Sequence, residues 1–167
     1  LRTSRAPIRM GGLAVGRYIM SDHAAVDPDV VQRAAAEPRA SVWVSASAGS
    51  GKTKVLTDRV LTLLLSGTAA NRILCLTFTK AAAAEMSNRV GGELALWTVT
   101  TEQELVRRLS RLLGKLPDAT IIGIARRLYA QVLNTPGGLK IQTIHSFCES
   151  LLARFPIESG VTPQTQV

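Results

Sequence analysis

The sequence of 167 residues predicts an α/β fold in which a parallel sheet is flanked by helices. Strand-like and helix-like segments alternate along the chain, which is the order that builds parallel sheets. A glycine-rich turn joins the first of these strands to the first long helix, and the second strand is a continuous apolar run, typical of a strand covered on both faces. The composition, 46% hydrophobic and 19% charged, excludes a disordered chain, and no apolar run approaches the ~20 residues of a membrane span.

Each element is justified by the spacing of its apolar residues and by the signals at its ends. Ser66-Gly67 and Gly91-Gly92 are stop signals, Thr101 to Glu104 is a capping box, and Asp118 is a second helix cap. In chain order we expect helix 27–36, strand 41–45, helix 52–65, strand 73–77, helix 80–90, two helices within 93–134, strand 139–144 and helix 145–155.

The chain divides into an extension, one interrupted lobe and an insertion. Residues 1–19 carry four arginines and no acid, half of the formal net charge of +8, and Met20 begins a stretch typical of a bacterial N-terminus. We interpret residues 1–19 as upstream sequence or a disordered extension. Residues 20–92 and 135–167 are expected to form one lobe, and residues 93–134 a helical insertion. Because three strands make a small sheet, we expect this lobe to be incomplete.

The cysteines and the basic charge say less about function. Cys75 and Cys148 are far apart and form no CxxC pair, so they predict neither a disulfide framework nor a zinc site, and they fit a reducing cytosol. We expect Cys148 in the core. The positive net charge suits a polyanionic partner, although the basic face formed by Arg107, Arg108, Arg111 and Lys115 is interpreted as a solvated helix side.

The strongest functional signal is a phosphate-binding loop between the first strand and the helix over 52–65. Glycines let the backbone approach a phosphate, and free N–H groups at a helix start attract it. Lys52 would place a cation on the β- and γ-phosphates, and the Thr53 hydroxyl would be a ligand of Mg²⁺. The loop consists of Ala46, Ser47, Ala48, Gly49, Ser50, Gly51, Lys52 and Thr53. Ala46 departs from the strict pattern, which begins with glycine.

A second motif, Thr77-Phe78-Thr79-Lys80, begins where the second strand ends. Ligands of parallel sheets bind at the carboxyl ends of the strands. The threonines are suited to phosphates, and Phe78 to stacking on a base. The alternative is that this stretch is an ordinary helix cap followed by an alanine-rich packing face.

A third motif, Thr143-Ile144-His145-Ser146-Phe147, also joins a strand to a helix. No serine, aspartate or metal-binding partner is spaced to make His145 catalytic, so a contact to a nucleic-acid backbone or a structural role fits it better. Gln32 precedes the loop by 20 residues. Its amide is suited to reading an adenine edge, and the alternative is a solvated helix residue.

These motifs, in this order, resemble those of the UvrD/Rep-like superfamily 1 DNA helicases. In that family the loop reads Ala-x-x-Gly-x-Gly-Lys-Thr, so Ala46 matches the pattern, and the second and third motifs contact single-stranded DNA. The resemblance covers residues 28–167. It is strongest to RecB-like helicase–nuclease proteins of the AddA type, which act in double-strand-break repair, over the runs 43–53, 77–86 and 135–145.

The resemblance implies a RecA-like P-loop NTPase fold and an ATP-dependent 3′→5′ DNA helicase that uses ATP and Mg²⁺. Gln32 would contact the adenine, and the DNA contacts would come from Thr77, Phe78, Thr79, Lys80, Thr143, His145, Ser146 and Phe147. The partners it implies are DNA and a second helicase–nuclease protein of the AddB type. It also implies no membrane and a cytoplasmic location.

The resemblance also indicates what the chain does not contain. The sequence has no Asp-Glu pair of the kind that holds Mg²⁺ in this family, no second motor lobe and no nuclease domain. We therefore expect an N-terminal fragment that is inactive in hydrolysis alone. A P-loop kinase or other phosphotransferase, and a non-catalytic DNA-binding remnant, are the alternatives to the helicase.

Overall fold

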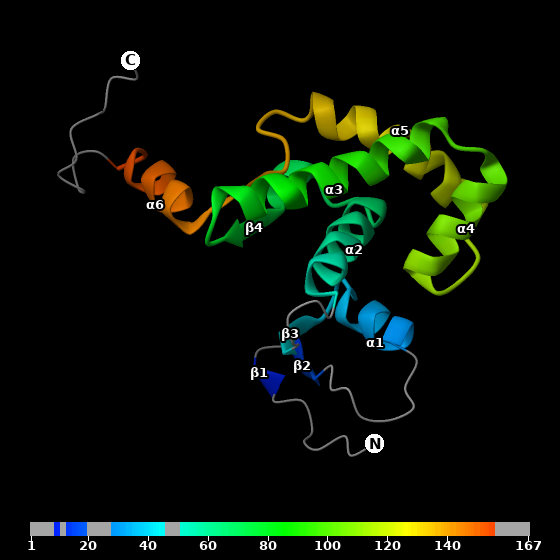
Figure 1. Ribbon diagram of the computed structural model, residues 1–167, viewed down its shortest axis with the longest axis horizontal. Coiled ribbons are helices and arrows are strands. Elements are labelled where there is room, and N and C mark those ends of the chain that lie inside the picture. The colour runs from blue at the N-terminus through cyan, green and yellow to red at the C-terminus, as the bar shows by residue number, and fades with distance from the viewer. Residues whose placement is uncertain (1–8, 11–12, 20–27, 46–50, 156–167) are drawn as a thin grey trace.

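The computed structural model describes residues 9–10, 13–19, 28–45 and 51–155 and has a mixed helix and strand architecture. One long helix, α3, runs through the upper part of the molecule, with α5 along it and α2 below it (Figure 1). The described helices are α1 (Pro28–Ala35), α2 (Lys52–Leu65), α3 (Lys80–Val99), α4 (Glu102–Leu113), α5 (Ala119–Asn134) and α6 (Ile144–Leu152), with a 3₁₀ turn η1 (Ala70–Arg72). The described strands are β1 (Arg9–Met10), β2 (Leu13–Ile19), β3 (Ser41–Ser45), β4 (Leu74–Thr77) and β5 (Lys140–Thr143). The predicted mixture of helices and parallel strands is confirmed.

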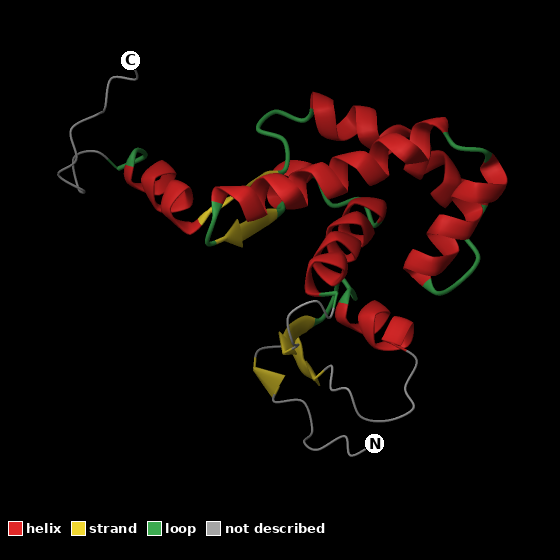
Figure 2. Cartoon of the chain, viewed as in Figure 1, coloured by secondary structure: helices red, strands yellow, loops and turns green. Residues whose placement is uncertain are grey.

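The strands form two small sheets at separate places in the molecule (Figure 2). β4 and β5 are parallel, with Thr77 opposite Thr143. β3 is parallel to β2, with Ser45 opposite Ile19, and β2 is antiparallel to β1. We expected all three predicted strands to share one sheet. Among the described residues β3 hydrogen-bonds to β2 instead of β4 or β5, which satisfies its backbone groups with the strand that lies beside it.

Strands β1 and β2 lie within residues 1–19, which we expected to be upstream or disordered. That expectation is wrong for residues 9–10 and 13–19, because they pair in register with each other or with β3. Val15, Tyr18 and Ile19 have the β-branched or aromatic side chains that favour strands. The division of the chain into lobe and insertion stays a prediction.

The hydrophobic core lies where α2, α3, α4 and α5 meet. Trp97 of α3 and Leu105 of α4 are almost fully buried in the same cluster as Leu64 of α2 and Leu128 of α5. Full burial of an aliphatic or aromatic side chain is worth about 1.5–3 kcal/mol, so this cluster dominates the packing. The helices of the predicted insertion therefore share one core with α2.

Helix α3 continues through Gly91-Gly92, so the predicted stop at residue 90 is wrong. Neither glycine has a positive φ, and a β-carbon on either would meet nothing within 4 Å. Val90, Leu94 and Trp97 are buried at helical spacing across the glycine pair. A glycine inside a helix costs about 1 kcal/mol relative to alanine, and the burial of this stripe outweighs that cost.

Sheet β4–β5 is covered on one face and not on both as expected. Cys75 and Ile141 pack against the core, whereas Leu74 and Leu76 are 43% and 44% exposed. Helix α6 has no buried residue, and Cys148 on it is exposed, so the expectation of a core position for Cys148 is wrong. The described helices include none with the length and apolar character needed to span a bilayer.

Candidate functional site

Helix α2 begins at a glycine in the left-handed conformation. Gly51, the N-cap, has φ 86° and ψ 16°, and its carbonyl accepts a hydrogen bond from the N–H of Val55 at 3.0 Å. The first turn carries Lys52 and no acid. This confirms the predicted turn at Gly51. The other predicted loop residues lie outside the described part of the chain: Ala46, Ser47, Ala48, Gly49 and Ser50.

The start of α2 differs from the starts of the four helices that follow it. Each of those four is capped by a side-chain oxygen that accepts from a first-turn N–H: Thr79 for α3, Thr101 for α4, Asp118 for α5 and Thr143 for α6. Gly51 has no side chain and makes no such cap. The first-turn amides of α2 are therefore left for another acceptor, and the helix dipole at that end favours an anion.

Gln32 of α1 lies against this helix start. A β-carbon on Gly51 would be 3.2 Å from Nε2 of Gln32, and Oε1 of Gln32 accepts a hydrogen bond from Nζ of Lys54 at 2.6 Å. Lys54 also pairs with Asp58 at 3.3 Å. The side chain of Gln32 therefore reaches the end of the predicted loop, with one amide atom held and the other directed to Gly51.

Arg59 fixes the connection between α1 and β3 on α2. Its guanidinium donates to three backbone carbonyls of that connection, at 3.3 Å, 2.7 Å and 2.7 Å: those of Ala35, Glu37 and Ala40. Sequence reasoning missed this residue, because no local pattern marks an arginine that holds distant carbonyls. Its effect is to keep α1, and with it Gln32, beside the start of α2.

The second and third motifs meet at the carboxyl edge of β4 and β5. Thr77 and Thr143 are opposite each other in the parallel register, so the residues that follow them leave the sheet side by side. Phe78 is 87% exposed, and Lys80 and His145 are exposed as well. This edge therefore carries an aromatic ring, an ammonium and an imidazole in contact with solvent.

The remaining polar residues of this edge have structural partners. Thr79 accepts from the N–H of Ala82 at 3.1 Å, and Thr77 donates to the carbonyl of Thr79 at 2.9 Å. Thr143 is buried, accepts from the N–H of Ser146 at 3.1 Å, and its hydroxyl is 3.0 Å from that of Ser146. The capping interpretation of these threonines is thus confirmed.

The structure assembles the candidate residues as two groups. One contains Gln32 with the start of α2, and the other contains the ends of β4 and β5. These groups belong to different sheets, since β3 leads to α2 and pairs with β2. Phe147 is half-buried and Thr53 is half-buried, each in the first turn of its helix.

Two groups away from these residues have displaced pKa values. Burial raises the pKa of Cys75 because it disfavours the thiolate. The pKa of Arg108 is raised by its hydrogen bond to Glu93 and by the charge of that carboxylate, with a smaller contribution from Glu104. Arg108 donates to both carboxylate oxygens of Glu93, at 3.1 Å and 3.3 Å, which ties α4 to α3.

The sequence matches the UvrD/REP helicase N-terminal domain family over residues 29–167. It is 34% identical over 126 residues to the AddA protein of an ATP-dependent helicase/nuclease from Lactobacillus acidophilus, covering 75% of this chain and 9% of that protein. Proteins of the same name from Latilactobacillus sakei and Enterococcus faecalis are 33% identical over 147 residues and 36% identical over 118 residues. These matches cover 87% and 69% of this chain but only 13% and 8% of the relatives, so the chain spans about a tenth of their length.

Proposed function

The chain belongs to the UvrD/REP helicase N-terminal domain family, and from that premise we propose that it forms the nucleotide-binding part of an ATP-dependent DNA helicase. The observation that carries the proposal is the start of α2. Gly51 leaves the first-turn amides uncapped, the first turn carries Lys52 and no acid, and Gln32 reaches the same point from α1. Three features suited to one nucleoside triphosphate therefore coincide.

ATP would be held by the loop at the start of α2. Its phosphates would accept hydrogen bonds from the amides, and Lys52 would place its ammonium on the β- and γ-phosphates. Gln32 would contact the adenine, and Mg²⁺ would be coordinated by the Thr53 hydroxyl. The complete set of nucleotide residues in the proposal is Gln32, Ala46, Ser47, Ala48, Gly49, Ser50, Gly51, Lys52 and Thr53.

Hydrolysis of the bound triphosphate supplies the free energy that moves such a helicase along DNA. The residues of this chain bind and orient the triphosphate, and none of its 12 acids forms an Asp-Glu pair that would position water. We therefore expect weak or absent hydrolysis from the 167-residue chain. Multiple-turnover hydrolysis that depends on Lys52 would contradict this part of the proposal.

Single-stranded DNA would be bound at the edge of β4 and β5. Phe78 is placed to stack on a base, and Lys80 and His145 are placed to meet phosphates. The amides at the starts of α3 and α6 add partial positive charge at the same edge. Thr77, Thr79, Thr143, Ser146 and Phe147 complete the proposed contact set, with the threonines shaping the turns that present the exposed side chains.

In the longer protein we propose the RecA-like first motor lobe of a 3′→5′ helicase–nuclease of the AddA type. Residues 20–92 and 135–167 would belong to that lobe and residues 93–134 to its helical insertion. The relatives are named as one component of a helicase/nuclease, which supports a second, AddB-like protein as partner. Repair of double-strand breaks would place the protein in the cytoplasm.

Calorimetric titration of Mg·ATP into the 167-residue chain tests the proposal. Lys52→Ala removes charge-assisted contacts worth about 1.5–3 kcal/mol, so the affinity should fall about ten- to a hundredfold. Lys115→Ala is the matched control, because Lys115 is exposed and follows α4. Equal affinity of the Lys52→Ala and Lys115→Ala chains, or no binding by the folded wild type, would overturn the proposal.

A further inference from the structure

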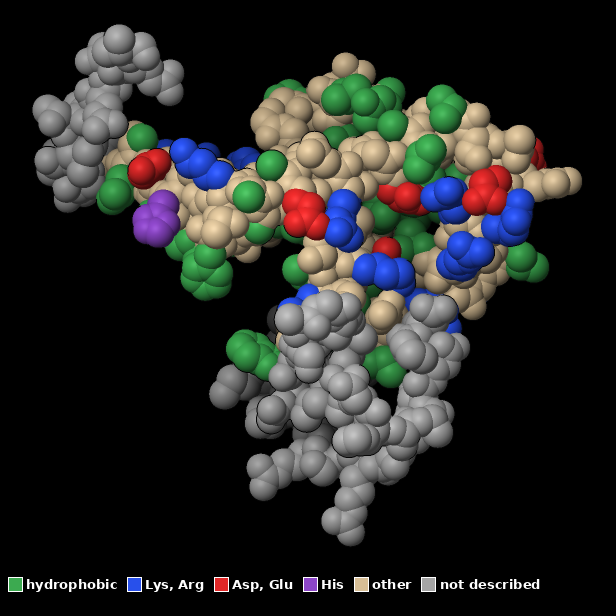
Figure 3. All heavy atoms as spheres, viewed as in Figure 1, with side chains coloured by type: hydrophobic (Ala, Val, Ile, Leu, Met, Phe, Trp, Pro, Cys, Tyr) green, Lys and Arg blue, Asp and Glu red, His purple; other side chains and the backbone are tan. Residues whose placement is uncertain are grey.

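A second concentration of charge lies away from both groups of candidate residues, in an open cleft of about 620 Å³ between α1, α2, α3 and α4. Lysine and arginine side chains gather around this hollow on one face of the molecule (Figure 3). Five basic side chains line it: Arg33, Lys54, Arg89, Arg108 and Arg111. The acidic lining residues are Asp58 and Glu93, so the cleft has an excess of three positive charges.

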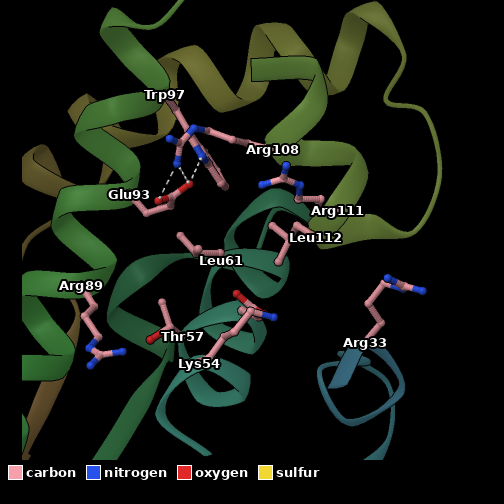
Figure 4. A pocket seen from close by; sticks show the side chains of 11 residues that line it. Arg33, Lys54, Thr57, Leu61, Arg89, Glu93, Trp97, Arg108, Arg111 and Leu112 are labelled. Carbon is pink, nitrogen blue, oxygen red and sulfur yellow. Dashed lines mark hydrogen bonds and ion pairs between the residues drawn. The ribbon is translucent and has the colours of Figure 1, made fainter. Parts of the chain in front are cut away.

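Several of these charges are already compensated. Arg89 pairs with Glu85 at 2.6 Å, and Lys54 pairs with Asp58 at 3.3 Å. Glu93 accepts from Arg108 at 3.1 Å and from Nε1 of Trp97, also at 3.1 Å (Figure 4). The carboxylates of the cleft are therefore engaged with their own neighbours.

Arg33 and Arg111 are different, because neither makes an ion pair or a side-chain hydrogen bond within the described residues. Arg33 extends from α1 toward the end of α4, where its Nε would be 3.0 Å from a β-carbon on Gly114. Arg111 comes from α4 itself and faces the same space (Figure 4). Two uncompensated guanidinium groups thus lie on opposite walls of one cleft.

We propose that this cleft binds the phosphodiester backbone of a nucleic-acid strand. The guanidinium fork matches a phosphate in bidentate geometry and is weakly hydrated, so two unpaired arginines on facing walls favour phosphate over water. The basic face of α4, interpreted from sequence as a solvated helix side, supplies one of the two. This site is separate from the β4–β5 edge and does not depend on stacking at Phe78.

The position of the cleft along α3 suits one strand that visits both places. Arg89 is nine residues after Lys80 on the same helix, a rise of about 14 Å at 1.5 Å per residue. A DNA strand advances about 3.4 Å per nucleotide in B-form, so about four nucleotides span that rise. A strand held at the β4–β5 edge would reach the cleft within a short oligonucleotide.

The test is a fluorescence anisotropy titration of the 167-residue chain with a fluorescein-labelled oligothymidylate of about 20 nucleotides, over a series of KCl concentrations. For Arg33→Gln/Arg111→Gln we expect at least a tenfold loss of affinity at low salt. The slope of log affinity against log salt should also fall by about 1.4, because each phosphate contact on a single strand contributes about 0.7. Arg33→Lys/Arg111→Lys should keep most of the slope.

The matched control is Arg72→Gln/Arg127→Gln, which removes two arginines outside the cleft that make no side-chain hydrogen bond or ion pair among the described residues. Equal losses in the two pairs of variants, or no loss in the cleft pair, would overturn the proposal. So would displacement of the oligonucleotide by polyglutamate at equal charge, since the cleft would then select acidic polypeptide. Phe78→Ala should weaken binding without changing the salt slope, which separates failure here from failure at the edge.

Discussion

Replacing Gly91 and Gly92 by alanine is expected to stabilise the protein. Both glycines lie inside α3 without a positive φ, and a β-carbon on either has no atom within 4 Å. Alanine in a helix interior is favoured over glycine by about 0.5–1 kcal/mol, so the double variant should gain about 1–2 kcal/mol. At about 2–4 °C per kcal/mol for a chain of this size, its Tm should rise by about 2–8 °C.

Thermal unfolding followed by circular dichroism at 222 nm measures this change. Gly67→Ala is the matched control, because Gly67 also has open space around it but has φ +89°. The left-handed conformation costs a residue with a β-carbon about 1–2 kcal/mol, so this variant should melt at a lower temperature than wild type. A lower Tm for the Gly91→Ala/Gly92→Ala chain would refute the reasoning and would mean that the helix stops at the glycine pair.

Three further predictions concern the α3–α4 joint, the sheet edge and the thiols. Glu93→Ala removes the acceptor of Arg108 and of the indole of Trp97, so the free energy of unfolding in urea should fall by about 1–3 kcal/mol; an unchanged midpoint would contradict that role. Phe78→Ala should weaken binding of a short oligothymidylate at least fivefold, as stacking is worth about 1–3 kcal/mol per base, with no change in Tm because the ring is exposed. Iodoacetamide at pH 8 should label exposed Cys148 before Cys75, whose pKa is raised by burial and which therefore holds less thiolate at that pH; mass spectrometry that finds Cys75 modified first would show the order to be wrong.

Local signals predicted the elements that carry the candidate site. The alternation of apolar strand, glycine turn and amphipathic helix gave β3 and α2 their observed limits, Ser41–Ser45 and Lys52–Leu65. Thr101 and Asp118 cap α4 and α5 as their side-chain chemistry predicts. These features depend on a few neighbouring residues, so a single sequence is enough to find them.

Features set by distant packing were not predicted. The stop signal at Gly91-Gly92 is overridden because Val90 and Leu94 are buried by other helices, and no window of sequence contains that burial. The pairing of β2 with β3 is likewise a contact between segments that are distant in the sequence. The neighbourhood of Arg33 and Arg111 arises only when α1 and α4 are folded against α2.

The candidate residues show the same division. Gln32 was expected at the nucleotide on resemblance, and its contact with Gly51 gives that expectation a geometric basis. Thr79 and Thr143 were open between capping and phosphate binding, and their hydroxyls cap helices. Sequence therefore placed these residues at the strand ends, and only the structure separates the side chains that hold the fold from those that face solvent.

The most direct measurement of the central claim is a two-dimensional amide NMR titration of the isotopically labelled chain with Mg·ATP. The backbone amides of Gly51, Lys52 and Thr53, together with the side-chain amide of Gln32, should show the largest chemical-shift changes, because they would donate to the phosphates and the adenine. Amides at the edge of β4 and β5, such as that of Thr143, should change little. Unchanged amides at 51–53 under saturating nucleotide, with shifts elsewhere in the chain, would contradict the assignment of this helix start to ATP.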